Sequence, residues 1–255
     1  MTADFKPIDS LEGRVAVIAG ALGAVGKATA ERLARRGARI VALHRKDPAE
    51  AKSWLATLPG RDHFDVRADI VDSAALTQAA ATVRERCGGI AHILVNTAGF
   101  TQPVPAANLD GLTDALIDDI FKSNWRGVFA TIRAFHPLLK ASGDAVIVNV
   151  SSIAGFTGVG SNLAYAASKA GLDVMAKGLA RALAPEVRIL SVSPGAVESS
   201  FVPGRGADFN AKTAATTPLK RVGLPEDVAA AIEACATTLR FSTGNVIVID
   251  GGRSV

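Results

Sequence analysis

Short apolar runs alternate along the chain with longer segments whose apolar residues recur at helical spacing. The first pair is typical, with a β-branched run "RVAVIAG" at 14–20 followed by "AVGKATAERLARRG" at 24–37. The same pattern predicts further strands at 39–44, 63–70, 92–99, 145–152, 187–195 and 245–252, and helices at 47–57, 72–87, 111–141, 163–184 and 225–238. Continuously apolar strands separated by helices indicate a parallel sheet covered on both faces. We therefore predict a single α/β domain over residues 1–255, with a doubly wound parallel sheet flanked by helices on both faces.

One segment falls outside this alternation. Residues 198–220 are rich in Ser, Gly, Pro, Thr and Ala. We expect a mobile loop over a site, with a plain surface loop as the alternative.

Composition narrows the class of protein. The 255 residues are 49% hydrophobic and 20% charged, as in globular proteins. The net charge of +4 comes from scattered basic residues, which argues against a nucleic-acid partner. Two distant cysteines favour a reduced, cytoplasmic setting, and no apolar run is long enough for a membrane span. The four histidines lack ligand spacing, so we predict no metal site.

A glycine-rich turn joins the first predicted strand to the first predicted helix. Gly20, Gly23 and Gly26 stand in "AGALGAVG" at 19–26. Glycines there permit close backbone approach, and the helix N-terminus offers N–H groups and a positive dipole to a pyrophosphate. A tight turn without a ligand is the alternative, but the position at the start of an α/β chain favours a dinucleotide site.

The end of the second predicted strand bears on which dinucleotide binds. Folds of this kind place an acid there for the ribose of NAD, or a basic residue for the 2′-phosphate of NADP. The sequence reads "VALHRKD", with His44 where the acid is expected and Arg45 and Lys46 next. A guanidinium can bind a phosphate, and no carboxylate repels it. We predict a preference for NADP(H), with NAD(H) as the alternative and two merely solvated basic side chains as the competing explanation.

The only tyrosine of the chain stands four residues before a lysine. Tyr165 and Lys169 belong to "YAASK", at the start of a predicted helix, so the two side chains share one helix face. A cation at that distance lowers the pKa of a phenol from about 10 toward neutrality, which makes it a usable general acid or base. A surface pair that is spaced by four by chance is the alternative.

Together these segments resemble the short-chain dehydrogenase/reductase family over nearly the whole chain, from about 11 to 252. The matching segments, in order, are the glycine turn at 20–26, "ADIVD" at 68–72, "NTAG" at 96–99, "SNWRG" at 123–127, "VSSIAG" at 150–155, "YAASK" at 165–169, "SPGAVESS" at 193–200 and "TGNVIVIDGG" at 243–252. Each segment is a weak signal alone, whereas the set in this order and spacing is strong.

The resemblance implies a Rossmann-like fold and a role for each matching residue. The implied catalytic residues are Asn124, Ser152, Tyr165 and Lys169. Ser152 would hydrogen-bond the substrate oxygen, Tyr165 would give or take the proton, Lys169 would hold the nicotinamide ribose, and Asn124 would anchor a water in a proton relay. The implied cofactor-binding residues are Gly20, Gly23, Val25, Gly26, His44, Arg45, Asp69, Ile70, Asn96, Ala98, Gly99, Tyr165, Lys169, Pro194, Gly195, Val197 and Ser199.

The sequence departs from the family pattern at several of these positions. Ala24 replaces the middle glycine of the cofactor turn, and Gly23 stands one residue earlier. Thr97 replaces the second Asn of "NNAG", Leu190 replaces a usual Asn, and Ser199 stands where a Thr is common. These departures bear on cofactor affinity more than on cofactor identity.

The resemblance implies an NAD(P)-dependent oxidoreductase that interconverts a ketone or aldehyde and an alcohol. Reductases that accept a carrier-protein thioester tend to be basic near two spots that here read "SGDA" at 142–145 and "APEV" at 184–187. Because these spots read as acidic, we favour a small-molecule carbonyl substrate. A 3-oxoacyl-(acyl-carrier-protein)-type reductase is one alternative, and a non-catalytic dinucleotide-binding redox sensor is an alternative of another class.

The sequence carries weaker signals for the substrate pocket and for the oligomeric state. We expect the pocket to be partly apolar and lined by Phe100, Thr101, Gln102, Phe156, Thr157, Phe201 and the loop to Pro218, although these residues could equally belong to the core. The resemblance implies a homotetramer, with a dimer as the fallback.

Overall fold

Seven parallel strands form one sheet at the centre of the molecule. The computed structural model describes residues 10–204, 206 and 208–255. The strands are β1 (Val15–Ala19), β2 (Arg39–His44), β3 (Phe64–Arg67), β4 (Ile93–Asn96), β5 (Ala145–Val150), β6 (Val187–Pro194) and β7 (Val246–Ile249). They lie in the order β3-β2-β1-β4-β5-β6-β7, and every neighbouring pair is parallel. The predicted fold class is confirmed.

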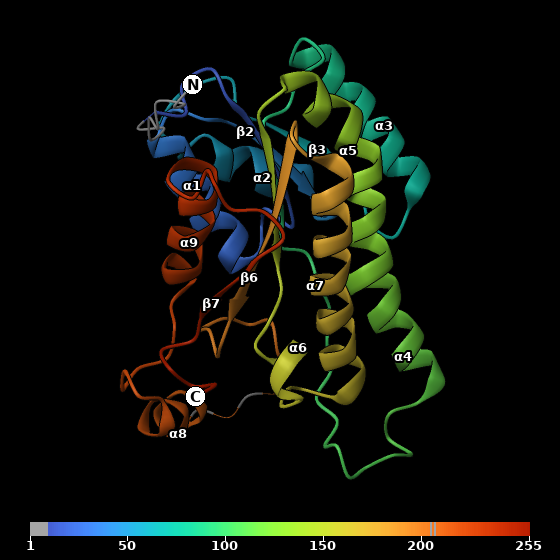
Figure 1. Ribbon diagram of the computed structural model, residues 1–255, viewed down its shortest axis with the longest axis vertical. Helices are drawn as coiled ribbons and strands as arrows, with labels where there is room; N and C mark the ends of the chain where they lie inside the picture. The colour runs from blue at the N-terminus through green and yellow to red at the C-terminus, as the bar shows by residue number, and fades with distance from the viewer. Residues whose placement is uncertain (1–9, 205, 207) are drawn as a thin grey trace.

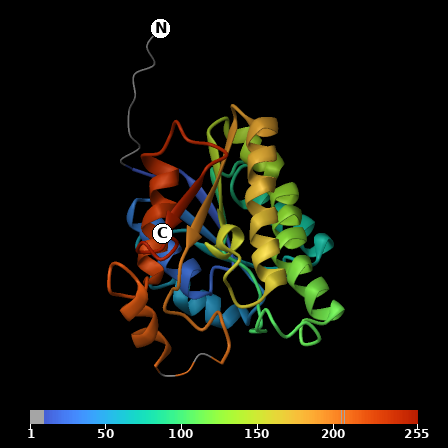
Figure 2. The same cartoon turned by 60° about the horizontal axis from the view of Figure 1, so that its bottom comes forward.

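Helices cover both faces of this sheet, as Figures 1 and 2 show. One face packs against α1 (Ala24–Arg35), α2 (Pro48–Leu55) and α9 (Pro225–Thr237). The other packs against α3 (Ser73–Arg86), α5 (Val128–Ser142) and α7 (Leu163–Leu183), with α4 (Asp114–Phe121) extending from α5. Two short helices, α6 (Ala154–Thr157) and α8 (Phe209–Thr216), lie in the lower half of Figure 1.

Alternation along each strand divides the core into two layers. Leu94, Ile147 and Ile189 point to the α3–α5–α7 layer, whereas their chain neighbours point to the α1–α9 layer. Leu190, which replaces a polar residue of the family pattern, is fully buried in that second layer. The apolar side chain therefore gains burial where the family has a hydrogen bond.

The strand order places a crevice at the carboxyl ends of β1 and β4. The chain runs from β1 outward to β2 and β3, and then returns past β1 to begin β4. Crossovers on the two sides of this point cover opposite faces of the sheet, so the loops that follow β1 and β4 diverge. Ligands of doubly wound sheets bind in the crevice that results.

Two predicted boundaries are wrong in an informative way. The helix predicted over 111–141 begins at Asp114, where the Thr113 side chain caps it, and contains a π-helical segment, η1 (Lys122–Gly127). The segment 198–220, predicted as a loop, contains α8, whose small Ala and Thr residues gave little apolar signal. Arg205 and Ala207 of that segment lie outside the described residues.

In the part of the chain that the structure describes, no helix combines the length and apolarity needed to cross a bilayer.

Candidate functional site

The turn after β1 has a shape that requires glycine. Gly20 has a positive φ of 83°, and a Cβ on it would lie 2.7 Å from the backbone nitrogen of Ala98. A Cβ on Gly26 would lie 2.3 Å from the carbonyl oxygen of Gly20. Such contacts leave no room for a side chain, so the backbone of this turn is open to a ligand that must approach closely.

The N-terminus of α1 faces the same turn. Gly23 is the N-cap, with no side chain to accept a hydrogen bond from the first helical N–H groups. Those donors and the helix dipole are therefore available to an anion. Ala24 is the first residue of α1 and lines the crevice, so its methyl group sits at an ordinary helical position. The turn with Gly20, Gly23 and Gly26 and the N-terminus of α1 together form a cradle. This cradle fits the pyrophosphate of a dinucleotide despite the departure at Ala24.

Thr97 ties this turn to the end of β4. Its Oγ1 donates to the carbonyl oxygens of Ala19 and Gly20, at 2.8 and 3.2 Å. A threonine hydroxyl thus holds the turn against the neighbouring strand, and this second departure from the family pattern retains a polar link.

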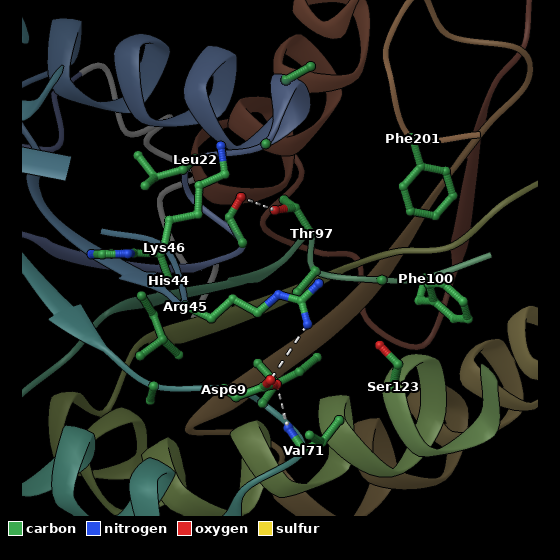
Figure 3. A pocket seen from close by; sticks show the side chains of 18 of the residues that line it. Leu22, His44, Arg45, Lys46, Asp69, Val71, Thr97, Phe100, Ser123 and Phe201 are labelled. Carbon is green, nitrogen blue, oxygen red and sulfur yellow. Dashed lines mark hydrogen bonds and ion pairs between the residues drawn. The ribbon is translucent and has the colours of Figure 1, made fainter. Parts of the chain in front are cut away.

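A cavity of about 560 Å³ extends from this turn over the ends of β2 and β3 (Figure 3). The implied cofactor residues Asp69, Ile70, Ala98 and Gly99 line it. Asp69 accepts a hydrogen bond from Val71 N at 3.1 Å, which fixes its carboxylate. Arg45 Nη1 lies 3.6 Å from Asp69 Oδ2, while the Arg45 side chain stays 77% exposed. A solvent-exposed guanidinium therefore stands at the mouth of the cavity.

Two residues of the implied cofactor set are placed differently from the expectation. The His44 side chain is buried, and its Nε2 lies 3.3 Å from Asp65 Oδ2, so the imidazole is held by β3 although the residue borders the cavity. Asn96 is also buried and lines neither cavity, since its Nδ2 donates to Asn149 Oδ1 at 2.8 Å. These contacts across the sheet could not be read from strand-end positions alone.

A second cavity of about 600 Å³ adjoins the first along the glycine turn. Ser152 follows β5, while Tyr165 and Lys169 lie on the first turns of α7, and all three line this cavity. The cavity is also bordered by the remaining implied residues Val25, Gly26, Pro194, Gly195, Val197 and Ser199. The structure thus brings three of the four implied catalytic residues to one wall, next to the dinucleotide cradle.

Lys169 and Tyr165 are neighbours, as the spacing of four predicted. Lys169 Nζ lies 5.7 Å from the Tyr165 ring centroid and donates to the Val150 carbonyl at 2.8 Å. Burial lowers the pKa of Lys169 to about 8, while the carboxylate of Asp173 opposes that shift. Asp173 is itself buried one turn further along α7, and burial raises its pKa. The protonation of Lys169 therefore depends on an acid that the motif does not include.

Asn124 has a different place from the other three. It lies in the π-helical segment, is fully buried, and lines neither cavity. Its Oδ1 accepts from Phe100 N at 2.7 Å, and its Nδ2 donates to Phe100 O at 2.9 Å and Ser168 Oγ at 3.2 Å. Both amide hydrogens are thus used within the protein. The side chain fixes the Phe100 loop. Because no amide hydrogen of Asn124 remains for a relay water, such a water would have to donate its own hydrogen bond to an oxygen atom here.

The expected pocket lining is confirmed only in part. Phe100 and Phe201 border the crevice, whereas Thr101, Gln102, Phe156 and Thr157 do not. Thr101 is buried and hydrogen-bonds Ser161, and Phe156 points to solvent. Phe209, in the expected loop to Pro218, lines the second cavity, whereas the lining residues that the sequence did not indicate include Leu22, Ser123, Pro103, Val159 and Arg253. Their loops converge only in the folded chain, so spacing carried no signal for them.

The segment "SGDA" at 142–145, which we expected to be acidic, is not acidic in the folded protein. Asp144 Oδ2 lies 2.9 Å from both Arg14 Nη2 and Arg240 Nη2. These two arginines come from distant segments and lower the pKa of Asp144 against the effect of burial. Glu186, directly before β6, lies nearby, since Ala145 N donates to the Glu186 carbonyl at 2.9 Å. The expectation of an acidic spot at Asp144 is therefore wrong.

Comparison with known proteins agrees with this geometry. Residues 20–254 match the family described as enoyl-(acyl carrier protein) reductase. The chain is 36% identical to ketoacyl reductase 2 assigned to the granaticin polyketide synthase of Streptomyces violaceoruber, over 96% of this chain and 97% of that one. It is 33% identical to the cis-4-hydroxycyclohexanecarboxylate dehydrogenase of Sinomonas cyclohexanicum, over 94% and 96% of the two chains.

A solved structure gives the same result. The short-chain dehydrogenase/reductase of Brucella melitensis, titled a glucose/ribitol dehydrogenase, is 30% identical and has a TM-score of 0.87. The match covers 98% of this chain and 99% of that one. The chain belongs to the short-chain dehydrogenase/reductase family and is an oxidoreductase that uses a nicotinamide dinucleotide.

Proposed function

We propose that the protein is an NADP(H)-preferring carbonyl reductase that interconverts a ketone or aldehyde and an alcohol. The observation that carries the proposal is the wall formed by Ser152, Tyr165 and Lys169 beside the glycine cradle. A redox sensor would need the cradle but has no use for a phenol and a hydroxyl that face the same cavity. Catalysis therefore explains more of the site than cofactor binding alone.

Each residue of the wall has a chemical task. A nicotinamide bound in the crevice supplies or accepts the hydride. Tyr165 gives a proton to the substrate oxygen during reduction and takes it back during oxidation. Ser152 stabilises the charge on that oxygen by a hydrogen bond. Lys169, held by the Val150 carbonyl, favours the tyrosinate electrostatically when it is protonated.

The preference for NADP(H) rests on the charges at the mouth of the first cavity. Arg45 and Lys46 are exposed there, and the residue before them is a histidine rather than an acid. Arg45 can exchange its 3.6 Å contact with Asp69 for a phosphate at little cost, because that contact is solvent-exposed. We expect Arg45→Ala to raise the Kd of NADPH about tenfold or more and to leave that of NADH nearly unchanged. Lys52→Ala, on the exposed side of α2, is the matched control.

The substrate class has two candidates within this chemistry. A small-molecule carbonyl suits the second cavity and the relative that acts on a cyclohexane alcohol. A 3-oxoacyl thioester suits the matched family description and the ketoacyl reductase relative. Asp144 no longer argues against the thioester, because two arginines outweigh its charge, whereas the argument from "APEV" at 184–187 is unchanged.

One assay tests the proposal. NADPH and NADH are offered separately with a panel of ketones, diketones, sugars, steroids and a 3-oxoacyl thioester, and loss of the reduced-nicotinamide absorbance is followed. We expect turnover with NADPH, reduced by roughly 10²- to 10⁴-fold in Tyr165→Phe. Full activity in that variant would show that another group is the acid. Tight cofactor binding without any turnover would instead favour the sensor.

We also propose a cytoplasmic homotetramer, with a dimer as the fallback. Val174 on α7 and Val248 on β7 remain exposed in the single chain, at 67% and 43%. Burial of such apolar surface between copies would stabilise an assembly. Light scattering on the purified protein tests this, and a monomeric mass would contradict both states.

A further inference from the structure

The far side of the second cavity is built from segments that follow β6 and β7. Phe209 begins α8, and Arg253 comes four residues after β7 ends, yet both line the cavity that Ser152 and Tyr165 border. Figure 1 shows α8 beside the C-terminus in the lower half of the molecule, and Arg253 Nη1 donates to Thr216 Oγ1 of α8 at 3.0 Å. A cation therefore shares a cavity with the proton donor.

This cation has no acidic counterpart in the cavity. Among the described residues that line it, Lys169 and Arg253 are the charged ones, and none is an acid. Lys169 is 4% exposed and is held by the Val150 carbonyl, so it belongs to the catalytic wall. Asp250, which has the acidic side chain nearest in sequence to Arg253, accepts from Gly252 N and Ser254 N instead. Arg253 makes no ion pair with an acidic side chain of the described residues, and it is exposed to solvent at the edge of the cavity.

The guanidinium is also held in place. Its Nη1 donates to Thr216 Oγ1 and, at 3.5 Å, to Thr217 Oγ1. Thr217 is itself buried, and its hydroxyl donates to Thr213 O at 2.8 Å. A guanidinium has five N–H donors, and these two contacts use one nitrogen. The other donors can bind an anion in a fork.

We propose that Arg253 binds an anionic group of the substrate, so that the enzyme acts on carbonyl compounds with a carboxylate or a phosphate at the end remote from the reacting carbon. This rests on the proposed function and names its substrate class. Val159, Pro203 and Phe209 line the cavity with Arg253 and provide apolar walls. The substrate that fits has an apolar body with a carbonyl directed at Tyr165 and an anion directed at Arg253.

The experiment compares matched pairs of charged and neutral substrates in Arg253→Gln. One pair is 4-oxocyclohexanecarboxylate and its methyl ester. The other is acetoacetyl-CoA and acetoacetyl-N-acetylcysteamine, which lacks the phosphates. We expect the variant to raise KM for the charged member of at least one pair about 10- to 100-fold, with KM for the neutral member changed less than threefold. The pair that responds distinguishes a carboxylate from a phosphate.

Lys212→Gln is the control, because it removes a cation from α8 that pairs with Asp208 and does not line the cavity. It should leave both pairs unchanged. Equal loss for charged and neutral substrates in Arg253→Gln would overturn the proposal, since Arg253 would then serve the fold. A raised KM confined to the nicotinamide cofactor would overturn it too, because the anion would be the pyrophosphate.

Calorimetry keeps the inference separate from the proposed reaction. 4-Oxocyclohexanecarboxylate and acetoacetyl-CoA are titrated into the protein saturated with NADP⁺, which measures binding without turnover. Weaker binding of either compound in Arg253→Gln, but not in Lys212→Gln, supports the anion site even if no panel carbonyl is reduced. Binding of neither compound, or equal binding to wild type and variant, overturns it.

Discussion

The buried acid beside the catalytic lysine gives the sharpest prediction. Asp173 lies one helical turn beyond Lys169 on α7, and its carboxylate raises the lysine pKa against the effect of burial, which leaves that pKa at about 8. We expect Asp173→Asn to lower the pKa of Lys169 further. The neutral amide keeps the shape of the side chain but removes its charge.

The size of the effect follows from the helix geometry. The Cβ atoms of residues four apart on a helix lie about 6 Å from each other, and we take this distance as the scale of the charge separation. At an effective dielectric constant of about 20 their charges interact by roughly 3 kcal/mol, which is about two pKa units. Lys169 would then titrate near pH 6 rather than pH 8, so its charged fraction at pH 7.5 would fall roughly 20-fold, but at pH 6 only about twofold.

The assay is the pH dependence of kcat/KM for ketone reduction. The pKa of Lys169 is depressed, so its charge is present below about pH 8 and is lost as the pH rises through that value. We therefore expect the wild-type rate to fall above about pH 8 and the rate of Asp173→Asn to fall above about pH 6. The other polar groups around Lys169 and Asp173 are the same in wild type and in Asp173→Asn. They are Lys177, Tyr165 and the hydroxyls of Ser151 and Ser191.

A control variant separates this effect from a change in net charge. Glu31→Gln removes one carboxylate on the exposed face of α1, where Glu31 pairs with Arg35. It should keep the wild-type pH profile. If the profile of Asp173→Asn also matches wild type, with the fold intact by circular dichroism, then Asp173 does not carry the charge that the reasoning requires.

Three further predictions concern the cradle and the core. Gly26→Ala places a methyl group against the Gly20 carbonyl and should raise the Kd of the cofactor at least tenfold, by fluorescence titration, with a stability loss of about 1–3 kcal/mol. Asn124→Ala leaves the two polar backbone atoms of Phe100 without their partner and should lower the free energy of unfolding by roughly 1–3 kcal/mol per group in urea titrations. Phe135→Ala empties a fully buried site and should cost about 3–5 kcal/mol in the same measurement; a loss below 1 kcal/mol in either of the last two variants would contradict the packing described.

Periodicity along the chain determined the fold class. Runs such as "VAVIA" are short, rich in β-branched residues and apolar at every position, as expected of a strand buried on both faces, and the strands at both ends of the sheet were predicted as well. The spacing of four between Tyr165 and Lys169 likewise fixed their contact, because an α-helix brings such residues together whatever surrounds it. Local rules of this kind need no tertiary information.

Contacts between distant segments decided the rest. Asp144 reads as acidic in the chain, but two arginines outweigh its single charge, because Arg14 and Arg240 reach it from positions 130 and 96 residues away. Asn124 lies in a π-helical segment, which helix propensity does not predict. Its two hydrogen bonds to Phe100 form only because the loop after β4 lies beside this segment. Arg253 lines the catalytic cavity only because the folded chain places the C-terminal segment against α8. Charge, burial and hydrogen bonding depend on distance in space, and spacing along the chain fixes that distance only within a single helix or strand.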